Sequence, residues 1–497
     1  MKESRINQSR TLSFALVCVA LTECTLLTSG RLFSIGPLSF RMVLFAVIGI
    51  LCIPYLCKHF FPIIKNPYTI SLFLFTAILA VGLVRAIRTG QEMSFAVYML
   101  KGCMYLLWFP ILLVAVRTRK QAECLLGIVI AAGSVLSLAA IAIALIAKYQ
   151  NAWITPLYYA LCDTNLGMLY MVTGTLPRVL FFGVMAQIAA CAFCAYFYLQ
   201  YFSDCGRRRI AVGLTAVNLI GLLLTYTRGI YLGAAAAVLC LTAGVLVCRD
   251  LRKTFARFLA ASVCCFLALV VLIYCILGYG IMSYGVFRLS LGTPLESAAQ
   301  TMFELSMGER PIFQPDAPDA PDAPDAPDAP DAPDTPDAPI DETPSQMQES
   351  IEIDKTRNEI SQNIRDEMSV KLNELISRDP IFGNGLGAHI DLRDGYVEMV
   401  WHDMASKIGI VGVAAFLLPL VLSVYIISAQ AAALRKKHCS NSLYLLRIAA
   451  LSCAATPMAA SFTNPYILSA LGLFFYCFMM RVCSTKDFPM EGMEDTL

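Results

Sequence analysis

The chain has 497 residues, of which 58% are hydrophobic and only 15% are charged, and its mean hydropathy is +0.65. A soluble protein cannot bury so large an apolar fraction, so the composition predicts an all-α, polytopic membrane protein. It excludes a cytosolic enzyme, a nucleic-acid-binding protein and a small secreted domain built on disulfides. The formal net charge of +2 is the sum of two parts, because residues 315–339 contain eight Asp and no basic residue while the rest of the chain is +10.

Twelve apolar stretches are long enough to cross a bilayer, which takes about 20 residues. Their centres lie near Val19, Ala46, Phe75, Leu106, Ser134, Ala190, Asn218, Val238, Cys265, Leu417, Cys453 and Phe475. The segments on the side of the two termini contain twenty Lys and Arg residues, against about seven in the short loops of the other side. Because basic residues favour the cytoplasmic side, both termini are predicted to be cytoplasmic.

This topology divides the chain into three parts. Residues 1–281 form transmembrane helices 1–9, residues 282–396 form one large periplasmic loop, and residues 397–497 form transmembrane helices 10–12. Within the loop, the Pro-Asp-Ala repeat of residues 315–339 predicts a solvated, extended spacer, with calcium or partner binding as the alternative. Residues 351–377 predict an amphipathic helix lying over the membrane surface or over a site. Its apolar face consists of Ile353, Ile360, Ile364, Met368, Leu372 and Leu375.

Two arginines are predicted at the outer membrane face. Arg228 lies in a short turn between two apolar stretches, and Arg178 lies at the outer start of the sixth predicted span. Each is either an anchor at the membrane interface or a ligand of an anionic substrate. A guanidinium group is a planar fork that matches phosphate oxygens, so two outward arginines suggest a diphosphate-linked lipid.

Glu398 and His402 are candidates for a general base. They are four residues apart, so on a helix they would share one face at the outer mouth of the tenth span. A carboxylate and an imidazole can take a proton from a hydroxyl group. No compact cluster of Asp, Glu and His is predicted outside the membrane, which favours a metal-independent reaction. Glu23 and Lys101, in the outer halves of the first and fourth spans, either pair with each other or line the same cavity.

Three sequence features resemble the bacterial O-antigen ligase and O-antigen polymerase superfamily. The stretch Leu222–Gly229 resembles that family's apolar-Ser/Thr-Arg-Gly turn. After the long outer loop, Pro380–Gly387 is similar to its Pro-x-x-Gly-x-Gly-x-Gly element, and residues up to Gly412 resemble the entry to its next helix. The features occur in the family's order within residues 174–419 and on one predicted side.

The resemblance implies a glycosyltransferase in the bacterial inner membrane whose active site faces the periplasm. It would transfer a glycan from undecaprenyl diphosphate to a glycan or lipid A-core acceptor, with inversion and without metal or cofactor. Its partners would be these substrates and membrane lipids, with no nucleic acid. Arg178 and Arg228 would hold the diphosphate.

The catalytic base departs from the family's pattern. Many members have a His-Asn pair about eleven residues before the glycine that corresponds to Gly409. Here that position holds Glu398, and His402 follows one turn later. The base is therefore Glu398, His402 or both acting together, and ligase and polymerase remain open. A lipid-linked glycan flippase or other transporter is the alternative function, and a scaffolding membrane protein is a third reading.

Overall fold

The computed structural model describes most of the chain outside the long predicted loop. The described ranges are residues 2–27, 34–35, 38–149, 153–164, 166–173, 176–277, 344–392, 397–437 and 442–485, together with residues 286 and 298. The Pro-Asp-Ala tract of residues 315–339 lies outside these ranges, so its prediction as a spacer is untested.

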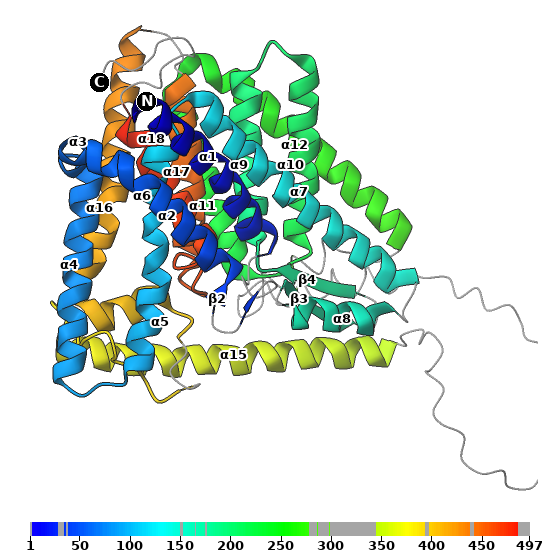
Figure 1. The fold of residues 1–497 in the computed structure, drawn as a ribbon. Helices are drawn as coiled ribbons and strands as arrows, with labels where there is room; N and C mark the ends of the chain where they lie inside the picture. Colours follow the sequence, from blue (N-terminus) through cyan, green and yellow to red (C-terminus); the bar gives the residue numbers. More distant parts are fainter. Residues whose placement is uncertain are drawn as a thin grey trace, which may run out of the picture.

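The fold is mostly helical (Figure 1). The helices are α1 (Lys2–Leu26), α2 (Phe40–Lys58), α3 (Phe60–Ile64), α4 (Pro67–Arg88), α5 (Met93–Cys103), the 3-10 turn η1 (Met104–Leu107), α6 (Trp108–Ala115), α7 (Arg119–Tyr149), α8 (Ile154–Asp163), α9 (Val184–Gln200), α10 (Cys205–Leu223), α11 (Arg228–Val247), α12 (Arg249–Leu277), α15 (Pro344–Arg378), α16 (Val400–Lys437), α17 (Ser442–Ala460) and α18 (Ala470–Ser484). The strands form two antiparallel hairpins, β1 (Ser34–Ile35) with β2 (Leu38–Ser39) and β3 (Gly167–Thr173) with β4 (Leu176–Phe181).

Local sequence signals fix several helix starts. The side chains of Ser39, Asn66, Asp204 and Ser469 each accept a hydrogen bond from a backbone N–H in the first turn of the following helix. These caps satisfy donors that a helix leaves without an intrahelical partner. Pro67 follows its cap at the first helical position, where the missing N–H costs nothing.

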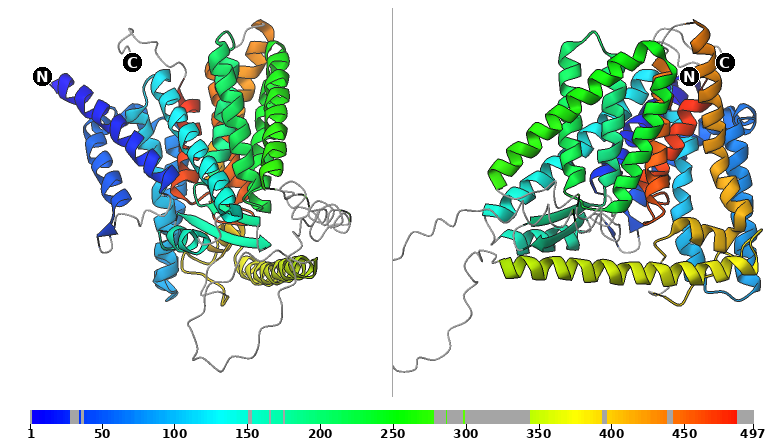
Figure 2. Two further views of the ribbon diagram at one scale, coloured as in Figure 1. Left: turned by 90° about the vertical axis from the view of Figure 1, so that its right-hand side faces the viewer. Right: turned by 180° about the vertical axis from the view of Figure 1, so that it is seen from behind.

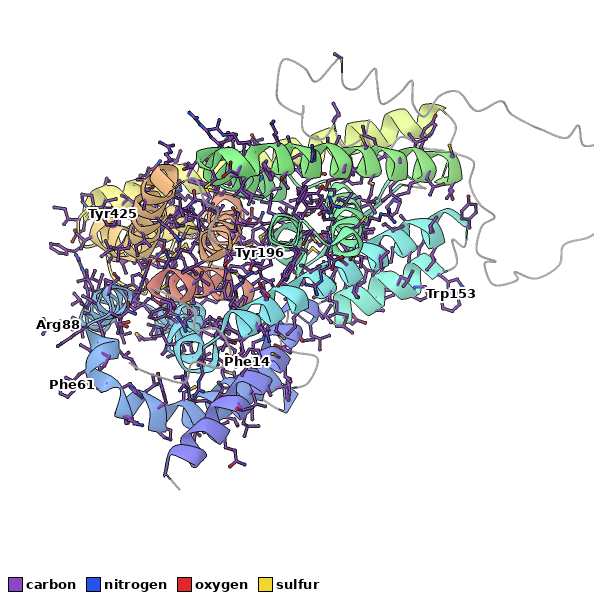
Figure 3. The ribbon with its side chains drawn as sticks, turned by 90° about the horizontal axis from the view of Figure 1, so that it is seen from above. Phe14, Phe61, Arg88, Trp153, Tyr196 and Tyr425 are labelled. Atoms are coloured by element: carbon purple, nitrogen blue, oxygen red, sulfur yellow. The ribbon has the colours of Figure 1, made fainter. Side chains whose placement is uncertain are left out.

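Nine helices in the described part of the chain are long and apolar enough to cross a membrane. The protein is therefore a multi-pass membrane protein, as its composition predicts. Each of the twelve predicted span centres lies in a helix, although the centres in α9, α10 and α18 belong to helices outside those nine. Figure 3 shows Phe61, Trp153 and Tyr425 on the rim of the molecule and Tyr196 in its interior, which fits exposed apolar side chains facing lipid.

Helix α1 begins and helix α18 ends at the same end of the helix bundle. Arg10 of α1 donates from Nε to the Val114 carbonyl at 3.3 Å, and Arg481 of α18 donates from Nε to the Val116 carbonyl at 3.0 Å. Both arginines thus contact the C-terminal end of α6, at Val114 and at the capping residue Val116. Figure 1 shows the opposite end of the bundle occupied by α8, the β3–β4 hairpin and α15. We refer to this as the hairpin end of the bundle.

Close helix packing in the bundle depends on small and polar side chains. Gly229, Gly233 and Ala237 follow one another at four-residue spacing on α11, which packs against α17 along its length. A Cβ on Gly233 would lie 2.8 Å from the Thr456 carbonyl oxygen, so only glycine allows this approach. Between α7 and α10, the Asn218 amide donates to Ser134 Oγ at 2.9 Å, which satisfies a fully buried polar group.

Glu23 does not pair with Lys101, which was one of the two predicted arrangements. Glu23 instead forms a bidentate salt bridge with Arg41 of α2, with Nε–Oε2 at 2.7 Å and Nη2–Oε1 at 2.9 Å. Both side chains of this pair are buried, whereas Lys101 is exposed. The pair joins α1 to α2, so Glu23 has a structural role.

The predicted amphipathic helix of residues 351–377 is longer than expected. It is α15, which starts at Pro344 and runs across the hairpin end of the bundle (Figure 2). Met368 and Leu372 of the predicted apolar face are buried and pack with Ile390, but Ile360 is 54% exposed. Among the side chains of this face that the structure describes, Met368 and Leu372 are therefore the ones that are fully covered by protein.

Candidate functional site

Arg178 lies in strand β4 and not at the start of a span, which corrects the sequence prediction. Helix α9 begins only at Val184, because residues 176–181 pair with β3 in an antiparallel hairpin. The preceding Pro177 also disfavours helix at this point. In the register of the hairpin, Arg178 is opposite Tyr170.

The hairpin brings Arg178 against the turn that precedes Arg228. Its Nε donates to the Thr225 carbonyl oxygen at 3.0 Å, and its Nη2 donates to Thr227 Oγ1 at 3.1 Å. The neighbouring Val179 N–H donates to the Leu224 carbonyl oxygen at 3.0 Å. Two arginine-bearing segments that are about fifty residues apart in the sequence are thus joined, as the interpretation of a shared site requires.

The turn itself has an unusual backbone. Tyr226 has φ of +45°, a left-handed conformation that costs a non-glycine residue about 1–2 kcal/mol. Its ring is fully buried in a cluster with Leu224, Leu169 and Val179. Burial of an aromatic ring contributes about 2 kcal/mol, which is enough to offset the backbone strain. The hydrophobic cluster therefore holds the turn in this shape.

Arg228 is the first residue of α11 and is half-buried. The backbone N–H groups of the first turn of a helix point outward and give that end a partial positive charge. The guanidinium group adds a full charge at the same place. This end of α11 is thus an electropositive position that favours an anion.

Gly229 sets α11 against the end of α17. A Cβ at this position would lie 1.9 Å from Thr463 Oγ1. The same part of α17 meets the start of α16, because Trp401 donates from Nε1 to the Met458 carbonyl oxygen at 3.1 Å and its ring centroid lies 6.3 Å from that of Phe462. The residues beside Arg228 and beside His402 are therefore connected through residues 458–463.

Glu398 and His402 do not share a helical face. Helix α16 begins at Val400, so Glu398 precedes it and only His402 belongs to its first turn. The Glu398 carboxylate is instead ion-paired with Arg365 of α15, with Nε–Oε2 at 3.2 Å. The path of the loop between α15 and α16, and not helical periodicity, sets the direction of Glu398.

Arg365 was not among the residues singled out in the sequence. A signal was present, because Arg365 lies three and seven residues before Met368 and Leu372 and hence on the buried face of α15. A charged residue on an apolar helical face needs a partner. A second charged pair follows in α16, where buried Lys407 lies 2.8 Å from Asp403.

The glycine-rich element of residues 379–387 is a structural joint. The N–H of Asn384 donates to the Ser406 carbonyl at 2.8 Å, that of Gly385 to the Lys407 carbonyl at 3.0 Å and that of Leu386 to the Gly82 carbonyl at 3.1 Å. The element thereby ties α16 to α4. Its backbone polar groups are used in this docking.

An ion pair and a cavity adjoin this joint. Arg85 of α4 lies 2.6 Å from Asp379 and also donates to the Gly383 carbonyl oxygen. The Arg85 guanidinium, with the Phe382 N–H, lowers the pKa of Asp379 below its usual value. A cavity of about 360 Å³ opens here, lined in part by Arg85, Arg378 and His389, and the His389 ring stacks on Phe95.

Within the described residues, no group of three or more His, Cys, Asp and Glu is arranged to hold a metal ion. Comparisons with protein-family models, with curated proteins and with solved structures give no match to this chain. The fold and the apolar helices define the class of the protein as a multi-pass membrane protein.

Proposed function

We propose that the protein is a membrane glycosyltransferase of the O-antigen ligase or polymerase type. It transfers a glycan from undecaprenyl diphosphate to an acceptor sugar at the periplasmic face of the bacterial inner membrane. The helices cross the membrane twelve times, with both termini in the cytoplasm. This topology is supported by the excess of Lys and Arg on the side of the termini and by the common end of the bundle at which α1 begins and α18 ends.

The junction of Arg178 with the Arg228 turn is the observation that carries the proposal. The hydrogen bonds to Thr225 and Thr227 fix the Arg178 guanidinium beside the start of α11, where Arg228 and the helix end favour an anion. A diphosphate gains negative charge when it leaves a sugar. Fixed guanidinium groups that face this charge lower the barrier by stabilising it.

The reaction is a displacement at the anomeric carbon of the donor glycan. The acceptor hydroxyl loses its proton to the base as its oxygen forms the new glycosidic bond. The bond between the anomeric carbon and the diphosphate oxygen breaks with its electron pair, and undecaprenyl diphosphate leaves. Glu398 and His402 act together in proton removal, with Arg365 as a positioning residue that holds the Glu398 carboxylate.

The proposal is tested by Arg228→Ala in cells, with Arg88→Ala as the matched control. Arg88 is an exposed arginine at the end of α4 (Figure 3). Arg228→Ala should lower transfer at least about a hundredfold, the size of effect seen when one charge-stabilising donor is removed. The lipid-linked donor should then accumulate on the periplasmic side, while Arg88→Ala leaves the surface glycan unchanged.

The glycan profile distinguishes the possible outcomes. Loss of a ligase leaves long chains on the carrier lipid, whereas loss of a polymerase leaves single repeat units. Donor trapped on the cytoplasmic side would identify a flippase instead. A normal surface glycan in Arg228→Ala, at normal protein level, would contradict the enzymatic proposal.

A second experiment assigns the base. Glu398→Gln and His402→Gln should each reduce the transfer rate by a factor of about 10²–10⁴, the range expected for loss of a general base. Arg365→Gln should have a smaller effect, because it removes the ion pair that holds the Glu398 carboxylate but leaves the carboxylate itself in place. If both Glu398→Gln and His402→Gln transfer glycan at the wild-type rate, the base lies elsewhere.

A further inference from the structure

A cavity lined by arginines lies at the end of the bundle that is opposite the proposed transfer site. It has a volume of about 430 Å³ and lies between the α11–α12 corner and the end of α16. Figures 1 and 2 show these two parts side by side near the end at which α1 begins. Arg249, Arg252 and Arg435 all line it, together with one carboxylate, that of Asp250.

The arginines come from different parts of the chain and remain exposed. Arg249 and Arg252 belong to the first turn of α12, while Arg435 lies at the end of α16, more than 180 residues later. Within the described residues, no ion pair links these three guanidinium groups to Asp250 or to another carboxylate. Arg252 is held at the wall, because its Nε donates to the Leu246 carbonyl oxygen at 2.8 Å.

Three guanidinium groups and one carboxylate line the cavity, so its lining has a net positive charge that favours an anion. Arg249 is the first residue of α12, so this helix start adds a partial positive charge, while the ends of α11 and α16 at the same cavity add partial negative charge; the full charges of the side chains therefore decide its sign. Guanidinium groups are frequent partners of phosphate groups, because their planar fork matches the phosphate oxygens. The cavity therefore favours an anion of the phosphate type.

The rest of the surroundings favours a lipid over a free phosphate. Val247 and Leu434 line the same cavity, and the outer surfaces of the adjoining helices include exposed Leu246 and Leu259. These apolar side chains offer contacts to acyl chains directly below a charged headgroup. Basic pockets between membrane helices near the cytoplasmic surface commonly bind anionic lipids.

We propose that this cavity binds the phosphate headgroup of an anionic phospholipid. The inference uses other residues than the glycosyl transfer proposed above, and it rests on the proposed function only for the cytoplasmic location of this end of the bundle. Headgroup binding would connect α16 to the α11–α12 corner, elements that both extend to the hairpin end of the bundle. The helices that present Arg228 and His402 would thus be linked at their far ends by one lipid.

The test measures lipid binding to the purified full-length protein by native mass spectrometry, with phosphatidylglycerol and phosphatidylcholine as probes. The double variant Arg249→Gln with Arg435→Gln removes two charges from the cavity. Each basic side chain near an anionic lipid contributes a factor of about five, so affinity for phosphatidylglycerol should fall about 25-fold. Arg435→Gln alone should lower the affinity for phosphatidylglycerol about fivefold. The affinity for phosphatidylcholine should not change in either variant.

The matched control is Arg207→Gln with Arg209→Gln, which removes two exposed charges from the start of α10 at the same end of the bundle. It should change the affinity less than about twofold, because these residues lie outside the cavity. Equal loss in the control and cavity variants would overturn the proposal. Displacement of phosphatidylglycerol by millimolar inorganic phosphate would overturn the lipid assignment in favour of a free phosphate site.

Discussion

The turn before α11 and the glycine-rich element before α16 lie at the same end of the bundle, but they reach left-handed backbone in different ways. The element and the helix it docks against use glycine, with φ of +73° at Gly383, +109° at Gly385 and +66° at Gly409. Glycine adopts these angles without steric cost. The α11 turn places a buried tyrosine, Tyr226, at +45°.

This difference in backbone indicates different roles for the two segments: the glycine-rich element is a structural joint, and the α11 turn is a candidate functional site. In the glycine-rich element, backbone groups bind backbone groups of α4 and α16, which explains its glycine pattern by packing alone. In the α11 turn, strain is retained because hydrophobic burial offsets it, and retained strain is most frequent at functional sites. The α11 turn has arginines at a helix start, where an anion is favoured, whereas Arg85 beside the glycine-rich element is paired with Asp379.

The largest expected effect on the unfolding free energy is that of Gly409→Ala, which tests how tightly the glycine-rich element is docked against α16. Gly409 has φ of +66° and ψ of −177°, a combination that is essentially limited to glycine, and a Cβ there would lie 2.1 Å from the Ile381 carbonyl oxygen. We expect a loss of roughly 4 kcal/mol or more in unfolding free energy. Thermal unfolding in detergent and the yield of monodisperse protein would measure it.

Gly127→Ala is the control for this prediction. Gly127 lies inside α7, and no atom lies within 4 Å of a Cβ built on it. Alanine there should be neutral or stabilise the protein by about 0.5–1 kcal/mol. If Gly409→Ala melts at the same temperature as Gly127→Ala, the docking of the glycine-rich element against α16 is not rigid.

A somewhat smaller loss of unfolding free energy is expected from Tyr226→Ala. This variant tests whether burial of the Tyr226 ring offsets the backbone strain at that residue. Removal of the ring leaves a cavity in the cluster with Leu224 and Val179, and the unfolding free energy should fall by about 3 kcal/mol. Tyr226→Phe keeps the ring and should stay within about 1 kcal/mol of the wild type. The comparison would fail if Tyr226→Ala raised the stability, because strain would then outweigh burial.

The smallest effect on thermal stability is expected from Asp379→Asn, at the solvent-accessible start of the glycine-rich element. The pKa of Asp379 is lowered in the folded protein by Arg85 and the Phe382 N–H. A lowered folded pKa contributes stability above the unfolded value of about 3.9, and this contribution is lost as pH falls through the folded pKa. The difference in Tm between wild type and Asp379→Asn should therefore be present at pH 6 and shrink as pH falls below about 4.

The pair with Arg85 is open to solvent, so the difference should be small and should decrease at high salt. A constant difference in Tm from pH 6 to pH 3 would show that Asp379 acts through its shape and not through its charge.

Much of the bundle follows from the sequence, because span length and hydropathy are sums over neighbouring residues. The predicted centres Val19, Phe75 and Leu417 all lie in helices for this reason. The glycines at four-residue spacing in α11 are typical of a face that packs closely against another helix, although they do not identify α17 as the partner. Arg178 and Arg228 could be identified from the sequence as candidate site residues. A charged residue beside an apolar stretch has a high free-energy cost in the membrane unless it meets a partner or water.

The sequence was less informative about strands and irregular segments. Residues 167–181 form a hairpin that moves Arg178 out of the predicted span, and strand pairing depends on a partner segment that hydropathy does not specify. Glu398 precedes α16 by two residues, which removes the i, i+4 relation to His402. Helix boundaries of this kind depend on how the flanking loop docks.

The sequence by itself determined a helical, multi-pass membrane protein. Tertiary structure alone decided which polar groups meet: Arg41 with Glu23, Arg365 with Glu398, Arg85 with Asp379, and Arg178 with the turn at Thr225. Hydropathy and net charge are local sums that require no knowledge of the path of the chain. An ion pair between residues 294 positions apart, such as Arg85 and Asp379, exists only because the folded path brings two helix ends together.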